Sequence, residues 1–173
     1  MYIKILGGLI LTASAAAIGL LKAEELQKRV TGLSELKRMM VLLQGELRFH
    51  RAILSEAFEN VAEHMNDPFS SYLKEMTVKL ENRDFGGFDG IWREISGKLL
   101  RDAGLDKKDG AILETLGSSL GYLDLTMQTE TLNLAILQTE EAVREAKGQL
   151  EIKGKIYRTM GVTVGALLTL MII

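Results

Sequence analysis

The sequence contains no cysteine, one proline and two histidines in 173 residues. Without cysteine there is no disulfide framework, no thiolate metal site and no cysteine nucleophile. A single proline favours long, uninterrupted helices over a turn-rich sheet protein. His50 and His64 leave little imidazole for a metal centre or a proton relay. These absences predict a helical protein that is not an enzyme and that holds no metal and no cofactor.

An excess of charge of either sign is also missing. Lys and Arg number 21 against 23 Asp and Glu, which gives a formal net charge of −2. A protein that binds nucleic acid usually carries a basic domain. We therefore expect no nucleic-acid partner, and no motif in the chain indicates a small-molecule substrate. The glycine-rich phosphate-binding loop of nucleotide hydrolases is absent as well.

Charged residues are missing from both ends of the chain. Residues 5–21 and residues 159–173 carry no charged side chain, and Lys4, Lys22 and Arg158 flank them. A membrane-spanning helix needs about 20 apolar residues, with a range of about 17–25. The sequence predicts the following division: an N-terminal membrane anchor in residues 1–22, a helical domain in residues 23–158, and a C-terminal membrane segment in residues 159–173.

Each terminal run has an alternative interpretation. The small residues 13–17 within the first run are also typical of a secretory signal with its cleavage site. The apolar sequence continues beyond them to Leu21, however, which favours an uncleaved anchor. The second run could be a terminal helix buried in a soluble core, but such a helix normally has a polar stripe. After the opening Thr159, only Thr163 and Thr169 are polar here.

Basic residues are frequent at both ends of the domain sequence, next to the two predicted anchors. They are Lys22, Lys28, Arg29, Lys37 and Arg38 after the first run, and Arg144, Lys147, Lys153, Lys155 and Arg158 before the second. Basic residues near membrane ends favour the cytoplasmic side. The domain is therefore predicted to be cytoplasmic, with both termini outside the cell membrane.

The domain between the anchors has helical periodicity throughout, because apolar residues recur at steps of three and four. No stretch alternates long enough to predict a strand. The six predicted helices carry these apolar stripes: Leu33–Leu47, Leu54–Met65, Phe69–Leu80, Phe88–Leu99, Ile112–Leu120 and Leu125–Leu150. The last helix has no strong breaker before the terminal apolar run and is predicted to continue into it.

Turn residues separate these helices. Asp67-Pro68 is typical of an N-cap followed by a first-turn proline, and residues 82–89, with two adjacent glycines, predict a loop. Gly104 is expected to end the fourth helix, and Asp106 to cap the fifth. Gly121 is expected to follow the fifth helix in the left-handed conformation.

Three segments resemble those of a known family. They are Lys4-Ile5-Leu6-Gly7 through Gly19, Glu46-Leu47-Arg48-Phe49, and Leu116-Gly117-Ser118-Ser119-Leu120-Gly121-Tyr122-Leu123-Asp124 through Gln128. On these segments the whole chain resembles the stage III sporulation protein AB family of endospore-forming bacteria. His50 and Ile53-Leu54 stand where that family favours Gly and Pro-Leu, so a less marked break is expected between the first two helices.

The resemblance implies a fold and a role that composition and periodicity do not show. Members of the family resemble the cytoplasmic domain of type II secretion system F platform proteins. The implied fold is an all-α, six-helix cytoplasmic bundle between an N-terminal and a C-terminal membrane helix. The implied role is a non-enzymatic platform in the channel apparatus between mother cell and forespore, in the mother-cell membrane facing the forespore. Implied partners are a secretion-type ATPase and other membrane components. The alternative is a generic helical membrane scaffold or signalling protein that shares only the architecture.

The third segment carries turn chemistry rather than a reaction. Glycine tolerates positive φ, an aspartate can cap the following helix, and glycines one turn apart let a neighbouring helix approach closely. We interpret the segment as the corner of a helical hairpin, with docking of a partner there as the alternative. The residues concerned are Leu116, Gly117, Leu120, Gly121, Asp124 and Gln128.

Two further sets of residues are candidates for contacts. Between Asp109 and Val143 there are acidic residues but no Lys or Arg, which predicts an acidic face that either only solvates the domain or docks a basic partner. The acidic residues are Asp109, Glu114, Asp124, Glu130, Glu140 and Glu141. The second set is formed by small residues of the predicted anchors, spaced for close helix packing in lipid. These residues are Ala13, Ala17, Gly161 and Gly165.

Overall fold

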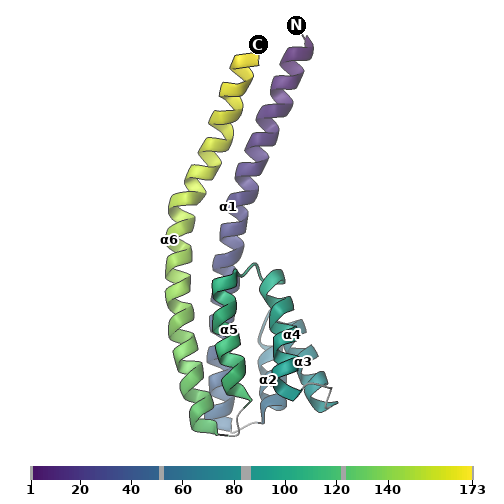
Figure 1. Ribbon diagram of the computed structural model, residues 1–173, viewed down its shortest axis with the longest axis vertical. Coiled ribbons are helices and arrows are strands. Elements are labelled where there is room, and N and C mark those ends of the chain that lie inside the picture. Colours follow the sequence, from purple (N-terminus) through teal and green to yellow (C-terminus); the bar gives the residue numbers. More distant parts are fainter. Residues whose placement is uncertain (1, 51–52, 83–86, 122–123, 173) are drawn as a thin grey trace. The chain divides into compact units, whose positions relative to one another are not determined.

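The computed structural model describes residues 2–50, 53–82, 87–121 and 124–172. Within these ranges all regular secondary structure is helical, as composition and periodicity predict (Figure 1). The elements are α1 (Tyr2–Gly45), a π-helix (Glu46–His50), α2 (Leu54–Glu63), α3 (Phe69–Glu81), α4 (Gly87–Asp102), α5 (Lys107–Leu120) and α6 (Leu125–Ile172). The all-α architecture of six α-helices is confirmed for this part of the chain.

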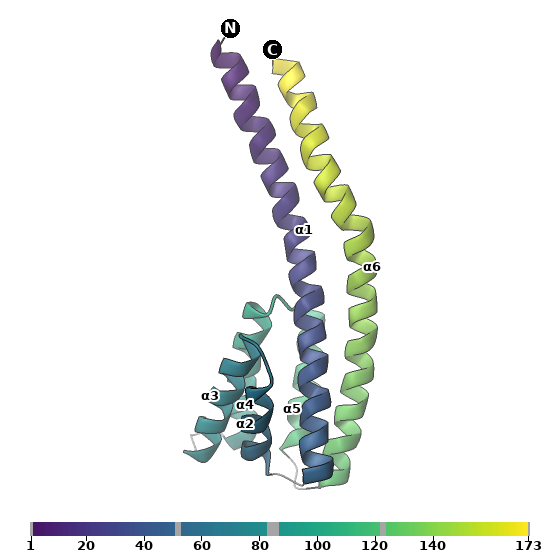
Figure 2. The same ribbon diagram turned by 180° about the vertical axis from the view of Figure 1, so that it is seen from behind.

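The chain divides into two compact units. One unit comprises Met1–Val30 and Glu145–Ile173, and the other is Thr31–Arg144, which we call the helical domain. In the first unit the beginning of α1 and the end of α6 run side by side in opposite directions, as both views show (Figures 1 and 2). Buried small residues of this unit include Ala23 and Ala146.

The two membrane anchors expected from the sequence are not confirmed. Among the residues that the structure describes, no helix combines the length and the apolar character needed to cross a bilayer. The described residues of both terminal runs are nevertheless helical, since α1 begins at Tyr2 and α6 ends at Ile172. The final helix thus continues without a break to the C-terminal run, as predicted.

The core of the helical domain is built from the predicted apolar stripes. The exposed fraction of Leu33, Leu36, Met40 and Leu43 on α1 is 0%. Every other helix adds buried apolar side chains: Phe58 and Val61 on α2, Phe69 and Met76 on α3, Ile91 and Ile95 on α4, Leu113 and Leu116 on α5, and Leu132 and Ile136 on α6. Burial of such side chains supplies most of the favourable free energy of folding.

Helices that follow one another in sequence also pack together in the domain. The successive pairs α2–α3, α3–α4 and α4–α5 are in contact. Polar contacts join α1 and α6: Gln44 Nε2 donates to the backbone oxygen of Thr129 at 3.2 Å, and Lys37 Nζ lies 3.2 Å from Glu140 Oε2. Because residue 37 pairs with 140 and residue 44 with 129, the two helices run antiparallel here.

Two predicted helix ends are confirmed, and a third is wrong. Helix α3 begins one residue later than predicted, because Pro68 rather than Asp67 is its N-cap and makes no side-chain cap hydrogen bond. Asp67 precedes the N-cap, and its Oδ1 accepts a hydrogen bond from the backbone amide of Ser71 at 3.2 Å. Gly104 follows α4 with a φ of +70°, a conformation that suits glycine. Asp106 caps α5, accepting from the backbone amides of Lys108 at 2.8 Å and Asp109 at 3.0 Å.

The predicted loop over residues 82–89 is too long. Helix α4 already begins at Gly87, whose φ is +61°, while residues 83–86 lie outside the described ranges. The ring of Phe88 stacks on Trp92, one turn further along, with 5.8 Å between ring centroids, and a pair at this spacing stabilises the first turn of the helix. The expected weak break between the first two helices falls partly on residues 51 and 52, which also lie outside these ranges.

An ion-pair network joins α3 and α4 on the surface of the domain. Lys79 Nζ lies 2.7 Å from Glu94 Oε2, and Lys98 Nζ lies 2.8 Å from Glu75 Oε1 and 2.9 Å from Glu94 Oε1. Hydrogen bonds from Lys79 and then Lys98 lower the pKa of Glu94 from 4.5 to about 2. The pKa of Lys98 is raised, mainly by its hydrogen bond to Glu75 and then by its hydrogen bond to Glu94.

We expect Glu94→Gln to flatten the acid dependence of stability. Because the folded pKa of Glu94 lies below its ordinary value, its contribution is complete above pH 4.5 and is lost as the pH falls towards 2. The measurement is the urea midpoint at several pH values in this window. Glu114→Gln, which removes an exposed carboxylate outside the network, is the control. If Glu94→Gln and the wild type lose stability in parallel, this contribution of Glu94 is contradicted.

Candidate functional site

The family-like segment forms the corner between α5 and α6. Leu116 and Leu120 are fully buried, with exposed fractions of 0%. Gly117 is buried between them, and Gly121 follows directly after the helix. Residues 122 and 123 lie outside the described ranges. The structure thus brings most of the segment together as one packed helix end.

Gly117 allows α5 to approach Trp92 of α4. A Cβ atom on Gly117 would lie 2.0 Å from Trp92 Cδ1 and 2.3 Å from Trp92 Nε1, far inside van der Waals contact. The same indole donates its Nε1 hydrogen bond to the backbone oxygen of Leu113 at 2.8 Å. The prediction that glycine here permits a close helix approach is therefore matched by a specific neighbour, which the sequence alone did not identify.

The predicted left-handed conformation of Gly121 is wrong. Its φ is −69° and its ψ is −11°, which is right-handed helical geometry. Glycine suits this position because there is little space for a side chain. A Cβ atom on Gly121 would lie 3.2 Å from Phe88 Cδ1 and 3.4 Å from Asp89 Oδ1. A side chain at this position would press against the first turn of α4.

Asp124 and Gln128 close the corner. Asp124 Oδ1 accepts from the backbone amide of Thr126 at 3.0 Å, so the predicted cap of the last helix is confirmed. Gln128 is buried and donates its Nε2 to the backbone oxygen of Leu120 at 2.8 Å. A carbonyl in the last turn of α5 is thereby satisfied by a side chain of α6.

We expect Asp124→Ala to destabilise the protein by about 0.5–2 kcal/mol, through the loss of this cap. The measurement is urea unfolding of the full chain, with Asp124→Asn as the control that keeps a capping oxygen. Equal losses in the two variants would contradict a role for the hydrogen bond to Thr126.

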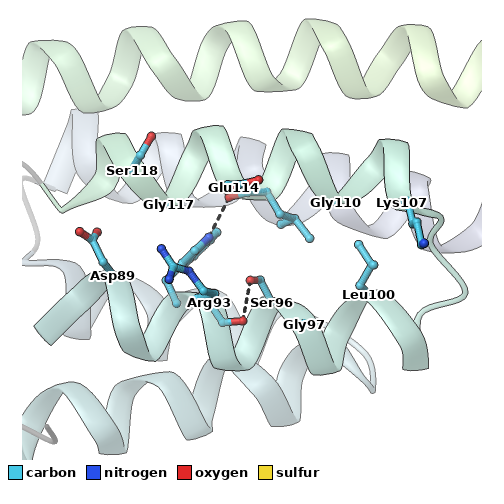
Figure 3. A pocket seen from close by; sticks show the side chains of 12 residues that line it. Asp89, Arg93, Ser96, Gly97, Leu100, Lys107, Gly110, Glu114, Gly117 and Ser118 are labelled. Carbon is cyan, nitrogen blue, oxygen red and sulfur yellow. Dashed lines mark hydrogen bonds between the residues drawn. The ribbon is translucent and has the colours of Figure 1, made fainter. Parts of the chain in front are cut away.

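A groove lies between α4 and α5, beside the corner. Its volume is about 440 Å³. Figure 3 shows α4 residues on one side and α5 residues on the other. The small residues that line it are Ser96, Gly97, Gly110, Gly117 and Ser118, and its charged residues are Asp89, Arg93, Lys107 and Glu114. Acidic and basic groups thus balance along the groove, which indicates no preference for an anion or a cation.

The predicted acidic face loses one member in the structure. Asp109 is 1% exposed, because its Oδ2 accepts from the backbone amide of Asp106 at 2.9 Å and completes a capping box. Glu114, Asp124 and Glu130 are exposed. Glu140 pairs with Lys37, and Glu141 contacts Arg144.

The small residues of the predicted anchors are only partly described. Ala13 and Ala17 are exposed, and the surroundings of Gly161 and Gly165 lie outside the description. Their proposed packing remains a prediction.

Metal-ligand chemistry finds little support in the described residues. No group of three or more His, Cys, Asp or Glu side chains there could hold a metal ion. His64 is exposed, and its Nδ1 lies 2.9 Å from the backbone oxygen of Asn60. At the corner, the cap by Asp124, the hydrogen bond from Gln128 and the close approach at Gly117 position the helices.

Comparison with known proteins gives consistent results. The chain is 21% identical over 173 residues to stage III sporulation protein AB of Bacillus subtilis (strain 168), covering 98% of this chain and 99% of the relative. A solved structure of stage III sporulation protein AB has the same fold, with a TM-score of 0.64 and 20% identity over 71% of this chain and 96% of that one. The family model described as stage III sporulation protein AB matches residues 4–173. This chain belongs to the stage III sporulation protein AB family.

Proposed function

We propose that this protein is a non-enzymatic membrane platform of a secretion-like channel apparatus that links mother cell and forespore during endospore formation. The observation that supports it most strongly is the family match over residues 4–173. The corner between α5 and α6 is consistent with it, because the hydrogen bonds and close contacts of its described residues position helices. Its partners in this proposal are a secretion-type ATPase and other membrane components of the channel.

The proposal includes anchoring of both ends in the mother-cell membrane that faces the forespore. It rests on the uncharged runs 5–21 and 159–173, which are continuous with α1 and α6, and on the basic residues beside them. In this arrangement the helical domain lies in the cytoplasm, and basic side chains near the surface attract anionic lipid headgroups by about 1 kcal/mol each.

Deletion of the gene in the source organism tests the role. We expect development to stop after engulfment while vegetative growth is unaffected, and the intact gene to restore spore formation. Matched strains should carry the deletion with and without the complementing copy, and the readouts are spore yield and the stage of arrest. Normal spore yield in the deletion strain would overturn the platform role.

Single cysteines test the anchoring, because the natural chain has none. Ser118 is exposed on α5, so Ser118→Cys should be shielded from a membrane-impermeant thiol reagent in intact cells and react after lysis. A cysteine added after Ile173 should react in intact cells. Labelling of Ser118→Cys in intact cells would reverse the topology, and shielding of both cysteines would contradict the anchors.

A further inference from the structure

The part of α6 that belongs to the helical domain has two different faces. One face is buried and carries Leu132, Ala135, Ile136 and Thr139. The opposite face is exposed but not uniformly polar. Its exposed apolar side chains are Met127 at 47%, Leu134 at 59% and Leu137 at 56%. Single exposed apolar residues are ordinary, but these share one helix face.

The exposed residues follow one another in alternating steps of three and four. This row, which we call the α6 seam, consists of Met127, Glu130, Leu134, Leu137, Glu141 and Arg144. All six side chains are exposed. Such spacing is that of the contact seam of a coiled coil, in which each seam residue packs against a facing helix. A helix that only faces water would carry polar residues in these places, so the α6 seam has the form of a helix-docking surface.

The carboxylates in the α6 seam argue against a second copy as the occupant. In an antiparallel pairing centred on Leu134 and Leu137, Glu130 of each copy meets Glu141 of the other. In a parallel pairing each glutamate meets its own counterpart. Like charges that are brought together in a desolvated contact repel and disfavour that partner.

Charge complementarity indicates a basic partner instead. No Lys or Arg occurs between Asp109 and Val143, so the surroundings of Glu130 on its own helix are acidic. At the other end Arg144 contacts Glu141, and both side chains are about two-thirds exposed, at 67% and 70%. An exposed pair of this kind contributes little, so a cation of a partner can share Glu141.

We propose that the α6 seam docks an amphipathic helix of another protein, with two apolar residues at its centre and a Lys or Arg one turn beyond each. The apolar pair covers Leu134 and Leu137, and the basic residues meet Glu130 and Glu141. This inference rests on the proposed function, because a platform acts by holding partners, and it specifies the surface and the chemistry of one of them.

A synthetic peptide supplies that chemistry in testable form. Its sequence is that of residues 125–145 with Glu130→Lys and Glu141→Lys, and the control peptide keeps both glutamates. Labelled peptides are titrated with the purified full chain in detergent, and fluorescence anisotropy is measured. We expect the lysine peptide to bind at least about tenfold more tightly than the control peptide, with a preference that falls as salt is raised.

Variants of the full chain assign the binding to the α6 seam. Leu134→Gln with Leu137→Gln should abolish binding of the lysine peptide, whereas Val78→Gln, at an exposed apolar position of α3, should not. Glu130→Lys with Glu141→Lys should reverse the preference between the two peptides. Glu114→Lys, the same charge change on α5, should leave the preference unchanged. Circular dichroism confirms that each variant is folded.

Equal binding of the two peptides would overturn the proposal, and so would a preference that survives the changes in the α6 seam. Self-association of the full chain that is abolished by Leu134→Gln with Leu137→Gln would identify a second copy as the occupant and also overturn it. Failure of the platform role is a separate result. It would appear as normal spore yield after deletion, whatever the peptides show.

Discussion

Phe58→Ala is expected to destabilise the helical domain by about 3–5 kcal/mol, the usual range for removing a buried aromatic ring. The exposed fraction of Phe58 is 0%. Its ring packs against Phe88 and Trp92 of α4, with centroids 6.5 Å and 6.2 Å away. Truncation to alanine leaves a cavity at the contact between α2 and α4, because the surrounding helices can relax only partly.

The measurement is urea unfolding of the full chain in mild detergent, followed by far-UV circular dichroism and by the fluorescence of the single tryptophan. Phe49→Ala is the matched control, because the ring of Phe49 is 76% exposed. The guanidinium carbon of Arg48 lies 5.6 Å from the centroid of the Phe49 ring. Loss of such a cation–π contact costs about 0.5–1 kcal/mol at an exposed site. Similar losses in the two variants would contradict the aromatic cluster as a main element of the core.

Gly117→Ala is expected to cost about 1–3 kcal/mol, although alanine is the better helix former. The added methyl group would lie 2.0 Å from Trp92 Cδ1. Relief requires either α5 or the indole to move, and the indole is held by its hydrogen bond to the Leu113 oxygen at 2.8 Å. The free energy of unfolding, measured by circular dichroism, gives the loss.

Gly97→Ala provides the matched control on α4. A Cβ atom at Gly97 would meet no atom within 4 Å, so we expect a gain of about 0.5–1 kcal/mol from helix propensity. Gly117→Ala combined with Trp92→Leu, which removes the indole ring that the methyl group would meet, should lose less than the sum of the single changes by more than about 0.5 kcal/mol. Strict additivity would show that the strain lies elsewhere.

The helical periodicity of the sequence predicted the elements and most of the core. Leu33, Leu36, Met40 and Leu43 all belong to the predicted first stripe, and all are fully buried. Such a stripe is local information, because side chains three and four residues apart necessarily share one helix face. The caps by Asp106 and Asp124 were predictable for the same reason, since each carboxylate bonds amides only two or three residues away.

Gly121 and Asp109 show where local patterns mislead. A glycine after a helix predicts positive φ, yet Gly121 is right-handed and lies close to Phe88. Asp109 was assigned to an acidic face by composition, but its carboxylate turns back to the Asp106 amide and is buried. In both places the deciding contact depends on how the backbone turns, which residue type alone does not specify.

The sequence by itself determined the helices, their buried stripes, the caps by Asp106 and Asp124, and the family to which the chain belongs. Only the tertiary structure decided that Trp92 fills the space above Gly117, that a groove lies between α4 and α5, and that Leu134 and Leu137 on the other face of α6 stay exposed. The row with Leu132 and Ile136 is buried, and the row with Leu134 and Leu137 is exposed. The row with Leu132 and Ile136 belongs to the stripe that periodicity predicts, and its burial is confirmed. The contact of Gly117 with Trp92 and the groove depend instead on how helices distant in sequence pack against one another, which local patterns do not specify.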